Sequence, residues 1–309
     1  TLSLHDALPI YANLSSDIPF NWFKDYSRMK TIEGLSNLRT DSVTNMSGMF
    51  KNCSSLVSLN FGWDINTRKV TKMGQMFSGC SSLEELDLSC FNTCKVENMA
   101  FMFTNCSNCK KLKLPNFDTR KVTNMNGMFK GCSSLDTLDL SRFDTQQVTE
   151  MASMFSGDSS LTTIQVSDNW RTDSLSNDDN MFKECVSLVG EKGTVYDKNH
   201  IDKSYAHIDE GESLPGYFSY GKQVYVVREG KTLTFYYGIA PDNSFIMRQD
   251  GVNGIEYYWQ SKINPDLSGS KLYRKEDTLI VIDRSMRDFH PYTTRRMFAD
   301  FENLHYIEN

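Results

Sequence analysis

The stretch Phe117–Leu135 reads FDTRKVTNMNGMFKGCSSL, and close copies of it recur on both sides. Each copy contains a Met-Phe pair, and the phenylalanines of these pairs are Phe50, Phe77, Phe103, Phe129, Phe155 and Phe182. Successive members of this series lie 26 or 27 residues apart. A fixed period between about 20 and 50 residues predicts a repeat architecture, in which each unit packs mainly on its neighbours.

Three further sets of equivalent residues, here called columns, recur at the same interval of about 26 residues. The column seven residues before the phenylalanines holds Val43, Val70, Val96, Val122, Val148 and Leu175. The column five residues before that holds Leu38, Ile65, Phe91, Phe117, Phe143 and Trp170. The column three residues after the phenylalanines holds Cys53, Cys80, Cys106, Cys132 and Cys185, with Asp158 as the exception. Apolar columns in phase predict a core of stacked, equivalent layers.

Each unit combines two hydrophobic periods. Leu86 and Leu88 alternate with polar residues, which predicts a short half-buried strand. The apolar positions of 122–132 are spaced as on one side of a helix-like turn, and Thr119 is placed to cap its first N–H groups, as Thr93 and Thr145 are in their units. The expected fold is therefore an α/β repeat solenoid. It is a leucine-rich-repeat-like array of about six 26-residue units, followed by a smaller β-rich module.

The repeat unit at Phe117–Leu135 resembles the BspA-like leucine-rich-repeat family of bacterial surface proteins. The segment Gly193–Tyr220 resembles the segment that closes such arrays, so the resemblance covers about Trp22–Tyr220. It implies an extracellular location at the cell surface and attachment to host extracellular proteins or other cells. It supplies no catalytic residues.

The patterns divide the chain into six segments. Residues 1–10 resemble one reading frame of a sequencing-adaptor oligonucleotide, which predicts that they are an artefact and not part of the fold; the alternative is an ordinary disordered leader. The remaining segments are an N-terminal flank and cap (11–28), the array (29–189), a C-terminal cap and linker (190–221), a β-rich spacer module (222–296) and the start of a second array (297–309).

Two local patterns support the last two of these segments. Val224–Val227 and Leu233–Tyr237 flank a Glu-Gly turn and predict a β-hairpin. Met297–Phe301 matches Trp22–Tyr26 at the entrance of the array, which predicts that a second array begins there. The alternative for residues 297–309 is an ordinary C-terminal helix.

Composition excludes several classes of protein. The 309 residues carry a formal net charge of −6 and a mean hydropathy of −0.46, and no apolar run approaches the length of a membrane span. The acidic balance argues against a nucleic-acid partner. The histidines lie in no recognisable nucleophilic or metal-binding motif, so the protein is expected not to be an enzyme.

Metal and cofactor sites are not expected. The cysteine column provides one small apolar side chain per coil, which favours structural thiols. Cys90, Cys94, Cys106 and Cys109 superficially resemble a zinc site, but two of them occupy ordinary repeat columns and the span between Cys94 and Cys106 is too long for one ion. An acidic group in 168–179 matches no EF-hand spacing.

The remaining candidate is the outward face of the predicted strands. Its two columns hold Ser58, Glu85, Lys111, Thr137 and Thr163, and Asn60, Asp87, Lys113, Asp139 and Gln165. Repeat arrays commonly bind partners on such a face, which favours an adhesion or ligand-binding protein. Two alternatives remain open. The alternating charges could merely support strand pairing in a structural stalk, or the Cys90–Cys109 group could serve a metal-dependent enzyme.

Overall fold

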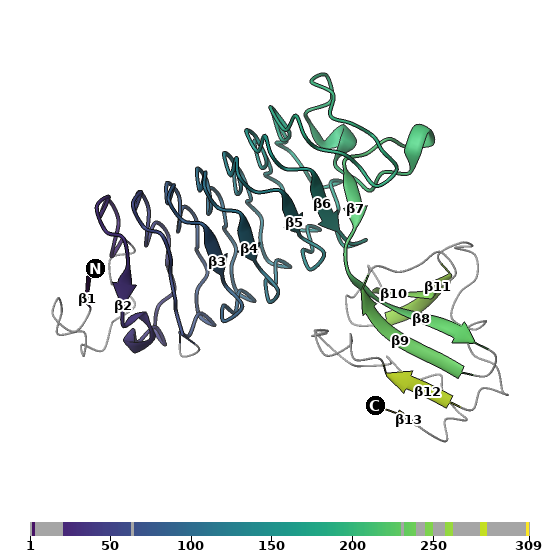
Figure 1. Cartoon of the computed structure of the whole chain (residues 1–309), viewed down its shortest axis with the longest axis horizontal. Coiled ribbons are helices and arrows are strands. Elements are labelled where there is room, and N and C mark those ends of the chain that lie inside the picture. Colours follow the sequence, from purple (N-terminus) through teal and green to yellow (C-terminus); the bar gives the residue numbers. More distant parts are fainter. Residues whose placement is uncertain are drawn as a thin grey trace. The chain divides into compact units, whose positions relative to one another are not determined.

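The computed structural model describes residues 2–3, 21–62, 65–229, 232–238, 245–249, 257–261, 279–282 and 307–308 (Figure 1). The chain divides into two compact units. The first holds Thr1–Val166 and Trp170–Ser219, and the second holds Ser167–Asn169 and Tyr220–Asn309. Both are rich in strands. Among the described residues the only helices are three short 3-10 helices, at Leu35–Asn37, Lys203–Tyr205 and Gly211–Ser213.

Short strands recur along the first unit, and Figure 1 shows β3 to β6 in successive coils of the chain. The strands are β1 (Leu2–Ser3), β2 (Ile32–Glu33), β3 (Glu85–Asp87), β4 (Lys111–Lys113), β5 (Thr137–Asp139), β6 (Thr163–Val166) and β7 (Phe218–Tyr220). The pairs β1–β2, β3–β4 and β5–β6 are parallel, and β7 lies beyond β6. Leu86 and Leu138 are buried between exposed neighbours, which confirms the predicted alternation. Parallel strand sheets with almost no helix are consistent with a leucine-rich-repeat-like fold.

The predicted helical return of each unit is wrong, because these segments are turns. In 122–132, the N–H groups of Met125, Gly127 and Phe129 donate to carbonyls of the next coil at 2.8–3.0 Å. The N–H groups of Met128 and Lys130 donate three residues back along the chain. An α-helix would need all these groups for its own ladder. Positive φ angles at Gly127 (55°) and Gly131 (74°) interrupt helical geometry as well.

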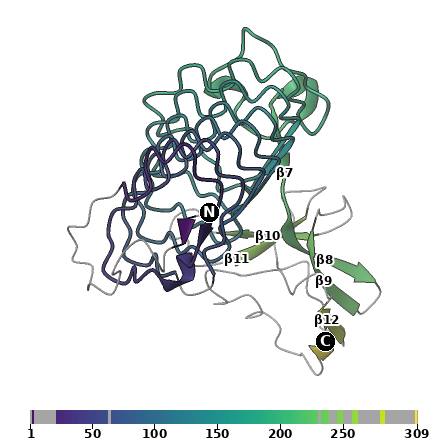
Figure 2. The same cartoon turned by 60° about the vertical axis from the view of Figure 1, so that its left-hand side comes forward.

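The same neighbouring-coil bonding extends through the array. Isolated parallel bridges join one position of every coil to the next, through Asn45, Lys72, Asn98, Asn124, Glu150 and Asn177. Figure 2 shows the successive coils from a second direction, in which they partly overlap. The backbone polar groups of each turn are therefore satisfied by the adjacent coil rather than by a helix.

The buried threonines also act differently from the prediction. The Thr119 hydroxyl does not cap its own turn; it accepts the N–H of Asp144 at 2.8 Å and donates to the carbonyl of the same residue at 2.8 Å. Thr93 makes the same pair of bonds to Asp118. One hydroxyl thus satisfies both backbone groups of a residue in the next coil, which explains why a polar side chain is fully buried in this column.

The predicted apolar columns are confirmed as the core. Phe50, Phe77, Phe103, Phe129, Phe155 and Phe182 are at most 1% exposed. Together with Phe23 their rings form one continuous stack, with neighbouring centroids 5.3–5.9 Å apart. The methionine, valine and leucine columns are buried in the same cluster. Each coil therefore supplies one layer to a core that continues along the array.

The second unit is a mixed sheet. Its strands are β8 (Gln223–Glu229), β9 (Thr232–Gly238), β10 (Phe245–Gln249), β11 (Tyr257–Ser261), β12 (Leu279–Ile282) and β13 (Ile307–Glu308), in the order β11-β10-β8-β9-β12-β13. The antiparallel pair β8–β9 confirms the predicted hairpin. Apart from β1 and β13, residues 1–10 and 297–309 lie outside the described residues, and the division into six segments stays a prediction.

Candidate functional site

The ten predicted face residues lie on the outside of the first unit. Eight of them belong to β3, β4, β5 and β6, whereas Ser58 and Asn60 are exposed in a segment that is not a strand. The pairing brings Glu85 beside Lys111, Asp87 beside Lys113, Thr137 beside Thr163 and Asp139 beside Gln165. The residues of β3, β4 and β5 are exposed, and those of β6 are half-buried. We call these eight residues the strand face.

The charges of the strand face pair with each other. The Lys111 Nζ lies 2.9 Å from a Glu85 oxygen, and the Lys113 Nζ lies 3.0 Å from an Asp87 oxygen. The hydrogen bond from Lys111 and its positive charge lower the pKa of Glu85. All four side chains are more than half exposed, so each pair adds little stability. The strand face is thus polar, regular and locally neutral between β3 and β4.

The cysteine column forms a row of buried thiol donors. The Sγ atoms of Cys53, Cys80, Cys106, Cys132 and Cys185 lie 2.9–3.2 Å from the carbonyl oxygens of Phe23, Phe50, Phe77, Phe103 and Phe155. Burial raises the pKa of the Cys106 and Cys132 thiols well above the usual range, so both stay protonated and able to donate. This geometry supports a structural role for the column.

Asp158 stands in the cysteine column without an equivalent donor. Its side chain is fully buried; Oδ1 accepts the Cys132 N–H at 2.7 Å, and Oδ2 has no hydrogen-bond partner. Burial raises the pKa of Asp158 well above its usual range, so the neutral acid is favoured in the folded state. The unfolded chain ionises near pH 3.9, and stability is therefore lost as pH rises above that value.

We expect the Asp158→Cys variant to be more stable than the natural sequence by about 2 kcal/mol at pH 7. The substitution replaces a carboxyl that ionises in the unfolded chain near pH 3.9 with a thiol that stays largely protonated from pH 4 to pH 8, and the Cys132 N–H keeps its bond to the Phe129 carbonyl. Thermal unfolding from pH 4 to pH 8 should show a gain that grows with pH. The control variant Asp158→Asn also cannot ionise and should lose the same pH dependence. An Asp158→Cys variant that is less stable than the natural sequence at pH 7 would contradict this account.

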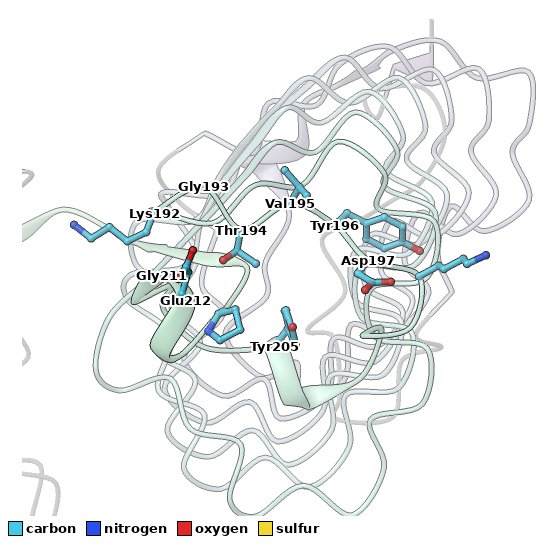
Figure 3. A pocket seen from close by; sticks show the side chains of 11 residues that line it. Lys192, Gly193, Thr194, Val195, Tyr196, Asp197, Tyr205, Gly211 and Glu212 are labelled. Atoms are coloured by element: carbon cyan, nitrogen blue, oxygen red, sulfur yellow. The ribbon is translucent and has the colours of Figure 1, made fainter.

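A hollow of about 840 Å³ lies in the segment that follows the last coil. Figure 3 shows the labelled side chains around it, with Val195 and Tyr205 on opposite sides. Its lining combines the cations Lys192 and Lys198, the acids Asp197 and Glu212, and the rings of Tyr196 and Tyr205. Periodicity could not reveal this hollow, since its residues belong to no repeat column.

Asp209 holds the loops around this hollow together. Its carboxylate accepts the N–H groups of Lys192 (2.8 Å), Thr194 (3.0 Å) and Gly211 (3.0 Å), and the Thr194 hydroxyl at 2.7 Å. Burial alone would raise its pKa, but these donors outweigh it and lower the pKa of Asp209 to about 2. The carboxylate therefore stays ionised and acts as the shared acceptor of the segments that contain Lys192, Thr194 and Gly211, within the predicted C-terminal cap.

The described residues suggest no metal centre. Cys106 and Cys109 donate to backbone carbonyls, and nowhere in the described ranges do three or more His, Cys, Asp or Glu residues come together in a way that could hold an ion. No helix in the described part of the chain has the length and apolar character needed to cross a membrane.

Comparison with known proteins agrees with the repeat architecture at the level of the sequence. The model of a family described as "Mycoplasma protein of unknown function, DUF285" matches twice, at residues 20–113 and 105–213. No curated protein matches the chain. Among solved structures, a leucine-rich repeat protein from Bacteroides ovatus is similar with 16% sequence identity and a TM-score of 0.17, over 54% of this chain and 67% of that one.

Proposed function

The chain belongs to the family described as Mycoplasma proteins of unknown function, DUF285, and from this premise we propose that it is a non-enzymatic adhesion or ligand-binding protein of the cell surface. The array is a leucine-rich-repeat solenoid of the BspA-like kind, and the strand face contacts host extracellular proteins or other cell surfaces. The extracellular location and the class of partner rest on the resemblance of the repeat unit to BspA-like surface proteins.

One observation carries this proposal. The strand face presents polar side chains in two columns at the same positions of adjacent parallel strands, and these side chains are exposed on β3, β4 and β5 and half-buried on β6. A regular polar surface of this kind offers hydrogen bonds and charges to a protein partner without exposing a large apolar patch. Single contacts on such a face are weak, so attachment would depend on many copies at the surface.

The second candidate function is a structural stalk that projects other domains. The pairs Lys111–Glu85 and Lys113–Asp87 favour it, because charges that neutralise one another across strands need no partner. In this case the strand face serves only the pairing of the coils.

A charge swap on the strand face separates the two candidates. The variant combines Glu85→Lys, Asp87→Lys, Lys111→Glu and Lys113→Glu, so both pairs remain but the charge pattern is reversed. Beads coated with the natural protein should adhere to an epithelial cell layer more than albumin-coated beads do. We expect the swap to reduce this adhesion by about tenfold, because a partner complementary to the old pattern meets like charges.

The matched control keeps the charges of the strand face and instead swaps four exposed residues outside it, through Lys130→Glu, Lys183→Glu, Asp173→Lys and Glu184→Lys, so that the net charge is again unchanged. It should adhere normally, and all variants should keep the melting temperature of the natural protein. Full adhesion by the charge swap would favour the stalk. Adhesion of the natural protein no stronger than that of albumin would contradict the adhesion function.

A further inference from the structure

A basic patch lies on the turns that follow three of the buried threonines, Thr67, Thr93 and Thr119. The two residues after the threonine are Asp41–Ser42, Arg68–Lys69, Cys94–Lys95, Arg120–Lys121, Gln146–Gln147 and Asp173–Ser174 in successive coils. Cations thus occupy three consecutive coils and are absent from these positions in the coils on either side. We define the basic patch as Arg68, Lys69, Lys95, Arg120 and Lys121.

Hydrogen bonds on both sides of the basic patch bring its coils into register. On the N-terminal side of the patch residues in the chain, the Asn92 N–H donates to the Thr67 hydroxyl of the preceding coil at 2.7 Å. On their C-terminal side, the Glu97 N–H donates to the Thr71 carbonyl of the same preceding coil at 2.8 Å. The next coil repeats both bonds, from Asp118 to Thr93 and from Thr123 to Glu97. Lys69, Lys95 and Lys121 are therefore stacked one per coil, with a backbone spacing of about 4.8 Å.

The stacking of like charges contrasts with the strand face. Glu85–Lys111 and Asp87–Lys113 show that adjacent coils of this protein can place opposite charges side by side. In the basic patch, Lys69, Lys95 and Lys121 are exposed and repeat the same sign. Within the described ranges, none of these three lysines has an ion-pair partner. Repulsion between like charges on adjacent coils opposes folding, so the arrangement of these lysines is not explained by stability.

The acids near the basic patch do not neutralise it. Asp118 binds Arg120 through two hydrogen bonds, of 2.9 and 2.6 Å, and so offsets one of the five cations. Glu97 lies two residues after Lys95 and is exposed. Asp144 of the next coil lies near Arg120, and Asp41 occupies the position of Arg68 in the preceding coil. Five cations against these four acids leave a local excess of one positive charge on a chain whose formal net charge is −6, and the cations without an ion pair in the described ranges include the row of Lys69, Lys95 and Lys121. A localised positive field of this kind attracts an anionic partner.

We propose that the basic patch binds an acidic polysaccharide, a linear chain with an anionic group on each sugar. Such a chain repeats its charges along one direction, as the lysines do from coil to coil. In one of the columns that flank the patch, the hydroxyls of Thr71 and Thr123 donate to the carbonyls of Thr44 and Glu97, and their oxygens can still accept a hydrogen bond from a sugar hydroxyl. Neither these columns nor the patch contains an aromatic residue on which a nucleic-acid base could stack.

Polygalacturonate is the probe for this proposal. The triple variant Lys69→Gln, Lys95→Gln, Lys121→Gln should bind it about tenfold more weakly than the natural protein in low salt, and the slope of log Kd against log salt should fall by about 2. The variant should keep the natural fold, and its melting temperature in low salt should be equal or higher, since it loses only like-charge repulsion. Titration calorimetry and thermal unfolding measure both effects.

The matched control replaces Lys110, Lys130 and Lys183 with glutamine, which removes the same charge from exposed lysines outside the basic patch. This control should keep nearly the full affinity, and neutral dextran should not bind to any of the proteins. An equal loss in the control and the triple variant would overturn the site, as would unchanged binding by the triple variant. Tighter binding of oligo-dT than of polygalacturonate at the same salt would overturn the polysaccharide assignment.

Discussion

Replacing Phe129 with alanine is expected to lower the free energy of unfolding by about 5 kcal/mol. The Phe129 ring is fully buried and stacks on Phe103 at 5.6 Å and on Phe155 at 5.9 Å, so its removal leaves a cavity between two coils. Each coil is held by its neighbours, and a gap in the middle should uncouple the two halves of the array. Urea unfolding of the natural protein should be one cooperative transition, whereas the variant should show an additional transition at lower urea, in which one half of the array unfolds first.

The control for this prediction lies at the end of the stack. Phe23 stacks on Phe50 at 5.3 Å and begins the described row of rings. The Phe23→Ala variant should therefore lose less stability, and the loss should be confined to the first coils in hydrogen exchange. If the Phe23→Ala and Phe129→Ala variants lost the same free energy of unfolding, the stability of a coil would not depend on having a neighbour on each side, and the account would be contradicted.

Replacing Asp209 with alanine is expected to lower the free energy of unfolding of the C-terminal cap by about 3 kcal/mol or more. The change leaves the N–H groups of Lys192, Thr194 and Gly211 without their shared acceptor. Caps shield the open end of a repeat array, so the last coils should exchange amide hydrogens faster while the central coils stay protected. Hydrogen exchange followed by mass spectrometry resolves the two regions.

The pH dependence of the cap provides the second test of Asp209. Its folded pKa of about 2 lies below the unfolded value of about 3.9, so the stabilisation is complete above pH 4 and is lost as pH falls toward 2. The alanine variant should lose this acid sensitivity. Glu210→Ala removes an exposed neighbouring charge and should change neither the exchange rates nor the pH profile. Acid sensitivity that persists without Asp209 would assign it to another group.

Asp158 and Asp209 show why burial alone does not predict the behaviour of a carboxyl group. Both are at most 1% exposed. Asp209 accepts several backbone N–H groups on two oxygens and stays ionised, whereas one oxygen of Asp158 has no partner and its acid form is favoured. The sequence marked Asp158 as an exception in its column but contained no sign of Asp209, because the donors of Asp209 come from loops without a period.

The repeat columns explain how much of the fold was predictable. A side chain that recurs every 26 or 27 residues in phase with other apolar residues must meet its own copy in the next coil, so the buried phenylalanine, valine and cysteine columns follow from spacing alone. The period does not reveal backbone conformation. The apolar spacing of 122–132 suits a helix and also suits the observed turns, which bury the same side chains. For this reason the burial was predicted correctly and the helix was wrong.

The sequence predicted which residues form the strand face, but it predicted only in part how their charges interact. Alternation of apolar and polar residues identified the columns of the strand face, and the alternating signs of Asp87, Lys113 and Asp139 predicted that charges could pair between strands. The ion pairs themselves depend on register between coils, which the structure supplies. The hollow beside Tyr196 and Tyr205 could not be predicted, since it depends on how the segment 192–198 and two short 3-10 helices, which belong to no repeat column, approach each other.

The amino-acid sequence by itself determined which side chains lie on top of one another, because equal spacing and equal chemistry leave a single way to bury every column at once. Tertiary structure alone decided where the polar groups go: Thr119 to the backbone of Asp144, the cysteine thiols to phenylalanine carbonyls, and Asp209 to the cap loops. Apolar contact has no direction and follows from pattern, whereas a hydrogen bond needs its partner at one distance and angle, and here that partner belongs to another coil or loop.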